Sequence, residues 1–156
     1  MAVSGGWHLA HLNVARLRAP MDAPELAGFV AELAAINAVA DQAPGFVWRM
    51  VDEDPNDPGL LSLGPLMLVN MSLWEDAASL ADYVYRSDHV RVFKRRGEWF
   101  LPSDGATSVL WWVEKGHIPS LTEAVERLMR LRKEGPTPHA FGFRKLYGAD
   151  ATERTV

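Results

Sequence analysis

Segments that favour strands and segments that favour helices follow one another in an order that few folds accommodate. Alternating or valine-rich apolar stretches predict strands, and apolar residues three or four apart predict helices. The predicted strands are residues 8–17, 46–51, 66–74 and 108–114. The predicted helices are residues 22–43, 75–85, 88–99 and 120–134. The order β-α-β-β-α-β predicts an α+β fold of the ferredoxin-like, split β-α-β type. It has a four-stranded antiparallel sheet, helices on one face and an extra C-terminal helix.

Local signals set the ends of these segments. Capping boxes are predicted at the starts of two helices, by Asp22 with Glu25 and by Ser120 with Glu123. Residues 52–65 hold three prolines and predict the longest irregular loop, of the kind that often binds ligands. Residues 139–146 predict a short edge strand, and the tail after about residue 146 is expected to fray.

Composition bounds the class of protein. The 156 residues fit one domain, expected to span 1–156. The formal charge of −4 argues against a nucleic-acid binder, and the absence of cysteine excludes disulfides and thiolate ligands. The sequence has no apolar run of about 20 residues and no signal-like start, so we expect a soluble, cytoplasmic protein with no membrane partner.

Alternation separates the two faces of the predicted sheet. Ala10, Leu12 and Val14 fall on the side that the helices are expected to cover. The opposite side carries polar side chains among apolar and aromatic ones, and these are His11, Asn13, Asn70 and Ser72. An exposed face of this kind needs a cover. We therefore expect a homodimer through this open sheet face. The interface either encloses a cavity for a small apolar or aromatic molecule or packs solidly.

Three residues are candidates for catalysis. His11 and Asn13 lie two positions apart on one strand face, where the imidazole could take a proton while the amide polarises a carbonyl or bound oxygen. His89 begins a predicted helix, whose positive end favours a neutral imidazole that could act as a base or a ligand. The alternative for each is a structural role, in an interface or at a helix start.

Further residues are candidates for substrate binding, and these are Asn70, Tyr83, Tyr85, Trp99 and Trp111. Aromatic residues at such spacings more often belong to a packed core than to a substrate site. A basic run also has two interpretations, as a patch that steers an anionic substrate or as a solvated helix face. It comprises Arg91, Lys94, Arg95 and Arg96.

Three long stretches carry a resemblance to a known family. They are WHLAHLNVARLRAPMDAPELAGFVAELAAINAVADQAPGFVWR, SLWEDAASLADYVYRSDHVRVFKRRGEWF and VLWWVEKGHIPSLTEAVERLMRLRKEGPTPHAFGF. They resemble an uncharacterised bacterial domain family related to the antibiotic-biosynthesis-monooxygenase-like superfamily. The resemblance implies a dimeric α+β barrel. That superfamily includes cofactor-free quinone-forming monooxygenases, haem-degrading oxygenases, haem-dependent enzymes, isomerases and lactone-forming enzymes.

The haem-degrading members use an asparagine on the first strand, a tryptophan after the third strand and a histidine as iron ligand. Asn13 matches the first position, whereas Tyr83 stands about where the tryptophan would be. His89 lies about one helical turn earlier than the pattern places the ligand. The resemblance therefore implies haem binding, but Tyr83 and the position of His89 both depart from the pattern of the haem-degrading members.

Three functions follow as hypotheses. The first is a monooxygenase-like enzyme, or an isomerase or cyclase, that acts without a cofactor on an aromatic or polyketide-like substrate. The second is a haem-binding protein or haem-dependent enzyme with His89 as iron ligand. The third is a non-catalytic binding dimer. The spacing of the histidines does not favour a metal site built from protein ligands alone.

Overall fold

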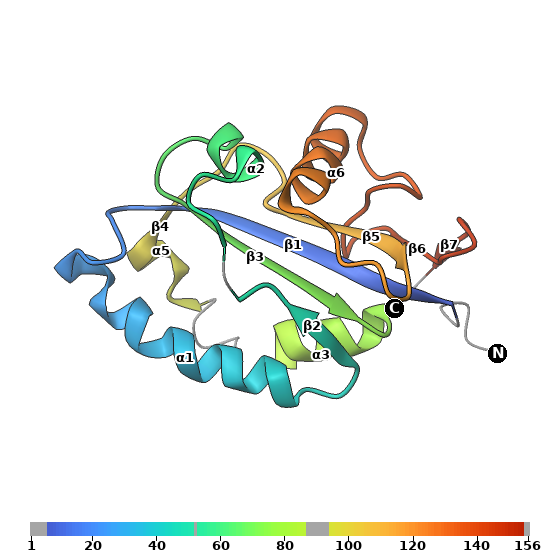
Figure 1. Cartoon of the computed structure of the whole chain (residues 1–156), viewed down its shortest axis with the longest axis horizontal. Helices are drawn as coiled ribbons and strands as arrows, with labels where there is room; N and C mark the ends of the chain where they lie inside the picture. Colours follow the sequence, from blue (N-terminus) through green and yellow to red (C-terminus); the bar gives the residue numbers. More distant parts are fainter. Residues whose placement is uncertain (1–5, 52, 87–93, 155–156) are drawn as a thin grey trace.

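The computed structural model describes residues 6–51, 53–86 and 94–154. A long central strand organises one antiparallel sheet (Figure 1). The strands are β1 (Trp7–Leu17), β2 (Phe46–Arg49), β3 (Met67–Trp74), β4 (Phe100–Leu101) and β5 (Ser108–Glu114). Their order is β2-β3-β1, and both β4 and β5 pair with the other edge of β1. This order confirms the ferredoxin-like arrangement, with its fourth strand split in two.

Helices lie on both faces of this sheet. They are η1 (Pro24–Leu26), α1 (Ala27–Gln42), α2 (Pro58–Ser62), α3 (Ala77–Arg86), α5 (Arg96–Trp99) and α6 (Leu121–Glu134). Figure 1 shows α1, α3 and α5 on one side of the sheet and α2 and α6 on the other. Among the described residues, no helix combines the length and the apolar character that a membrane crossing requires.

The side chains of Ala10, Leu12 and Val14 point toward α6. They form one core with three fully or nearly buried groups of that helix, which are Leu121, Val125 and Leu128. The sequence predicts that the helices after β1 and β3 cover the side of the sheet that carries Ala10, Leu12 and Val14. That prediction is wrong, because α6 covers this side. The C-terminal helix presents its own apolar stripe, and β1 buries its most uniformly apolar face against it.

The opposite face of the sheet lies beneath α1, α3 and α5. Leu9 and Trp74 pack there with Leu80 of α3, while Phe29 and Ile36 of α1 belong to a neighbouring core cluster. These helices cover the face only in part, because Asn70 on β3 is exposed and Asn13 on β1 is half-buried. The homodimer through this sheet face stays a prediction.

Several shorter segments also differ from their predictions. The 52–65 loop contains α2, which begins where the Asp57 carboxylate accepts a hydrogen bond from Gly59 N at 2.8 Å. The helix after β1 starts with η1, whose N-cap is Ala23, so Asp22 forms no cap. Residues 139–146 contribute a single pairing to β5, between Leu110 and Phe141. The tail is a hairpin of β6 (Leu146–Tyr147) and β7 (Glu153–Arg154), where fraying was expected.

Candidate active site

Three strands contribute a row of polar side chains to the face beneath α1. In the register, His11 is opposite Ser72, and Asn13 lies between Asn70 on β3 and Ser108 on β5. Residues opposite each other on antiparallel strands point to the same face with their Cβ atoms about 5 Å apart. His11, Asn13, Asn70, Ser72 and Ser108 therefore form one cluster, which we call the polar row.

His11 is the buried member of the polar row, with 9% of its surface exposed. Its Nε2 atom lies 2.8 Å from Ser108 Oγ, and which of the two donates depends on the imidazole tautomer. The ring of Phe143 packs edge-on to the imidazole, with 6.1 Å between ring centroids. The histidine is thus held in one position beside a hydroxyl group.

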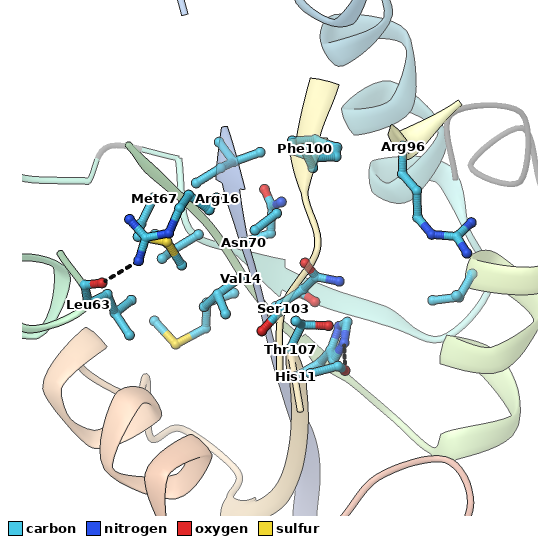
Figure 2. A pocket seen from close by; sticks show the side chains of 18 of the residues that line it. His11, Val14, Arg16, Leu63, Met67, Asn70, Arg96, Phe100, Ser103 and Thr107 are labelled. Carbon is cyan, nitrogen blue, oxygen red and sulfur yellow. Dashed lines mark hydrogen bonds between the residues drawn. The ribbon is translucent and has the colours of Figure 1, made fainter. Parts of the chain in front are cut away.

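A cavity of about 1140 Å³, lined by residues from both faces of the sheet, reaches the polar row. Its apolar lining includes Phe29, Leu33 and Ile36 from α1. Aromatic side chains also reach it from elsewhere in the chain, namely Tyr83, Tyr85, Phe100 and Phe143. Figure 2 shows His11 and Asn70 among the lining residues. A few polar groups on an otherwise apolar concave wall are typical of a small-molecule site.

The cavity also reaches the other face of the sheet, where Leu63 and Met67 pack against the core beneath α6. Arg16, Leu63 and Met67 line this second part (Figure 2). The Arg16 guanidinium donates hydrogen bonds to the carbonyl oxygens of Pro65, at 2.7 Å, and Leu63, at 3.4 Å. These bonds join the end of β1 to the loop after α2.

Tyr83 of α3 forms part of the wall. Its ring stacks on Trp74, with 5.3 Å between centroids, and its hydroxyl donates to the carbonyl of Ile36 on α1 at 3.3 Å. Burial raises the pKa of Tyr83 to about 12, so the phenol stays neutral at physiological pH. Trp74 in turn donates from Nε1 to Ser72 Oγ at 2.9 Å, which links this wall to the polar row.

The structure brings most of the predicted site residues together. His11, Asn13, Asn70, Tyr83 and Tyr85 all line the cavity. His89, the remaining catalytic candidate and the predicted iron ligand, lies outside the described residues. Haem binding therefore stays a prediction.

Two predicted substrate-binding residues lie away from the cavity lining. Trp99, 2% exposed, packs against Phe29 with 5.5 Å between ring centroids and belongs to the core beneath α1. Trp111 is fully buried on the α6 side, where its Nε1 donates to Glu123 at 3.0 Å. Both side chains have the core role that their spacing favours.

Two residues of the site, Ser108 and Phe143, could not be predicted from the sequence. Ser108 shares a face with Leu110 by alternation, but its place beside His11 depends on the pairing of β1 with β5. Phe143 belongs to a segment with almost no ladder pairing, so no periodic pattern points to it. In the described part of the chain, no three His, Cys, Asp or Glu residues are grouped in a way that could hold a metal ion.

The fold and the site together define a split β-α-β domain whose cavity is lined from both faces of the sheet and reaches the polar row. The chain belongs to the family described as "Domain of unknown function (DUF3291)", whose model matches residues 8–155. The sequence-based expectation of an uncharacterised domain family is thereby confirmed. No curated protein matches the chain.

The chain is similar to several solved structures at low identity. One is a conserved protein from Methanosarcina mazei, at 14% identity and a TM-score of 0.49, over 70% of this chain and 94% of that one. A second is a protein of unknown function from Nitrosomonas europaea, at 12% identity and a TM-score of 0.48, over 74% of this chain and 97% of that one. A third is SnoaB, a cofactor-independent oxygenase from Streptomyces nogalater, at 15% identity and a TM-score of 0.46, over 72% of this chain and 98% of that one. Identities this low leave the chemistry of this chain to its own residues.

Proposed function

We propose that this protein is a small-molecule enzyme whose cavity takes an aromatic or polyketide-like substrate and whose base is His11. The observation that carries the proposal is the buried imidazole, fixed 2.8 Å from Ser108 Oγ on the wall of a largely apolar cavity. Histidine is the side chain that acts most often as a general acid or base.

The neighbouring amides supply the second part of the chemistry. Asn13 and Asn70 face each other across β1 and β3 and line the same cavity as His11. Amide N–H groups there would donate to an oxygen on which negative charge develops as His11 removes a proton. The acid to be deprotonated is a phenol or a carbon beside a carbonyl group.

Proton removal is the first step shared by cofactor-free oxygenation, isomerisation and cyclisation. Our proposal favours oxygenation, in which the electron-rich anion reacts with O₂ directly. In the balanced reaction, a methylene group and O₂ give a carbonyl group and water. One oxygen atom enters the product, and the other leaves as water with both methylene hydrogens. The protein would act by binding the substrate, holding the proton on His11 and stabilising the developing charge.

The proposal is tested with His11→Ala and, as a matched control, the exposed His139→Ala. Oxygen consumption is measured with anthrone, whose methylene lies beside aromatic rings, and with a set of hydroxynaphthalenes. We expect the loss of His11 to lower the rate by at least about 100-fold, as for a general base, and the loss of His139 to leave it unchanged. Equal rates in wild type and His11→Ala, or no turnover by the wild type, would refute the proposal.

A further inference from the structure

Ser108 is a nucleophilic side chain that the proposed oxygenation does not use. Its Oγ atom lies 2.8 Å from Nε2 of His11, which is buried. In the tautomer that carries its proton on Nδ1, the imidazole accepts this hydrogen bond and the serine donates it. A serine hydroxyl that donates to a neutral imidazole is the arrangement in which histidine activates serine as a nucleophile.

The Ser108 hydroxyl lies where a ligand in the cavity can reach it. Ser108 begins β5, is half-buried and lines the cavity together with His11 (Figure 2 shows the histidine). Ser72, the other serine of the polar row, has a different partner, because its Oγ accepts a hydrogen bond from Trp74 Nε1 at 2.9 Å. Of these two hydroxyls, Ser108 is therefore the one that is bonded to a base.

Asn13 supplies the third group that acyl transfer needs. It is directly opposite Ser108 in the register of β1 and β5, and both residues line the cavity. Residues opposite each other in this way have their Cβ atoms about 5 Å apart on one face. When a nucleophile attacks an ester, negative charge develops on the carbonyl oxygen, and a carboxamide N–H beside the nucleophile stabilises that charge.

The surface beside the serine and the histidine is apolar and aromatic. Phe143 packs edge-on to His11, and Tyr85 packs edge-on to Phe143 with 5.6 Å between ring centroids. Phe29 and Ile36 of α1 line the same cavity. Walls of this kind favour a substrate whose acyl group is apolar or aromatic.

We propose that this site also hydrolyses carboxylic esters of apolar or aromatic acids, with Ser108 as nucleophile, His11 as base and Asn13 as donor to the oxyanion. Ser108 Oγ bonds to the carbonyl carbon while its proton passes to His11 Nε2. The bond from that carbon to the alcohol oxygen then breaks, and His11 gives the proton to the departing alcohol. Water, deprotonated by His11, attacks the acyl-serine, and Ser108 regains its proton. The net reaction converts an ester and water into an acid and an alcohol.

The first test follows acylation by 4-nitrophenyl butyrate. Wild type, Ser108→Ala and His11→Ala are mixed with the ester, absorbance follows the release of 4-nitrophenol, and peptide mass spectrometry locates the butyryl group. We expect a butyryl adduct on Ser108 of wild type. Release should be at least about 100-fold slower in either variant, as for the loss of a nucleophile or its base.

Ser103→Ala is the matched control for this test. Ser103 is an exposed serine that also lines the cavity, but its hydroxyl donates to the carbonyl of Gly105 at 3.4 Å. Its loss should change neither the adduct on Ser108 nor the rate of release. Circular dichroism checks that each variant is folded.

A second test needs no ester and no alanine at position 108. The chain has no cysteine, so Ser108→Cys and Ser103→Cys each carry a single thiol. An imidazole beside a thiol stabilises the reactive thiolate. At about pH 6, iodoacetamide should alkylate Ser108→Cys at least about tenfold faster than Ser103→Cys, although position 103 is the more exposed. Adding His11→Ala to Ser108→Cys should remove this advantage.

The two tests decide the inference independently of the proposed oxygenation, because neither consumes oxygen. An adduct on Ser108 that requires His11, together with the faster thiol at position 108, supports the inference. No adduct on wild type, an unchanged rate of release in Ser108→Ala, or a thiol at position 108 no faster than that at position 103 overturns it. Oxygen uptake with anthrone reports separately on the proposed function.

Discussion

Tyr83 joins α3, α1 and the sheet through one side chain, so its protonation is coupled to folding. The folded protein holds the pKa of this phenol at about 12, mainly because burial disfavours the phenolate, whereas an unfolded chain has an ordinary value near 10. Below pH 10 both states keep the proton. Between pH 10 and 12 the unfolded state releases it first, and the stability contributed by burial of the neutral phenol is lost.

The free energy of unfolding should therefore fall by about 1.4 kcal/mol per pH unit over this range through Tyr83 alone. Urea titrations of wild type and Tyr83→Phe from pH 9 to 11.5 isolate this contribution, because every other group is common to both proteins. Above pH 10, the free energy of unfolding of wild type should fall steadily relative to that of Tyr83→Phe. Parallel curves would show that Tyr83 titrates normally.

Gly45 is the second residue with a specific conformational demand. Its φ of +81° lies in the left-handed region, and a Cβ atom there would collide with the Ser79 side chain. Gly45→Ala should cost about 2 kcal/mol of stability, measured by thermal unfolding. Gly142→Ala serves as the control, since a Cβ at that position meets no atom within 4 Å and should leave the melting temperature nearly unchanged.

At the scale of single residues, strand alternation was sufficient to place His11, Asn13 and Asn70 on one face. This rule depends only on the backbone and holds for any strand. Ser108 could not be placed in the same way, because its neighbours are fixed by which strands pair and in what register. Trp111 could not be placed either, because alternation separates two faces without saying what covers each.

At the scale of elements, α6 is the helix whose role differs most from a simple ferredoxin-like fold. Ser120 caps it by accepting a hydrogen bond from Glu123 N at 3.1 Å, as its sequence predicts. Leu128 is fully buried against the sheet, whereas the next residue, Met129, is 40% exposed. The helix thus covers the sheet with one narrow stripe of side chains.

Leu128→Ala should destabilise the protein by about 3 kcal/mol through the lost contacts and the cavity left behind. Met129→Ala should cost less than about 1 kcal/mol. Chemical denaturation of both variants measures the difference. A loss from Leu128→Ala no larger than that from Met129→Ala would mean that α6 does not hold this face in solution.

Long periodic segments, such as β1 and α6, could be predicted from the sequence because many residues repeat one signal. β4 could not, since two residues show no period. The η1 turn before α1 and the helix α2 inside the 52–65 loop are also too short to produce a pattern. Their positions follow from tertiary packing and from local caps such as Asp57.

At the scale of the whole molecule, β1 is the strand around which everything else is placed. From Leu9 to Asn13 it pairs with β3 on one edge and β5 on the other. By contrast, β2 is short, half-buried and interrupted by an irregular register. Amides of β1 should therefore exchange with solvent most slowly and those of β2 much faster, measured by native-state hydrogen exchange. Similar protection for both strands would contradict this organisation.

The placement of different layers on the two faces of β1 also has an evolutionary consequence. Neighbouring residues on this strand have different surroundings, because Ala10 and Leu12 belong to the core beneath α6 whereas His11 and Asn13 face the cavity. We expect substitutions at the cavity positions to change the site while the alternate positions keep the fold intact. Diversity along β1 should follow a two-residue rhythm, with variable chemistry set between constant apolar positions.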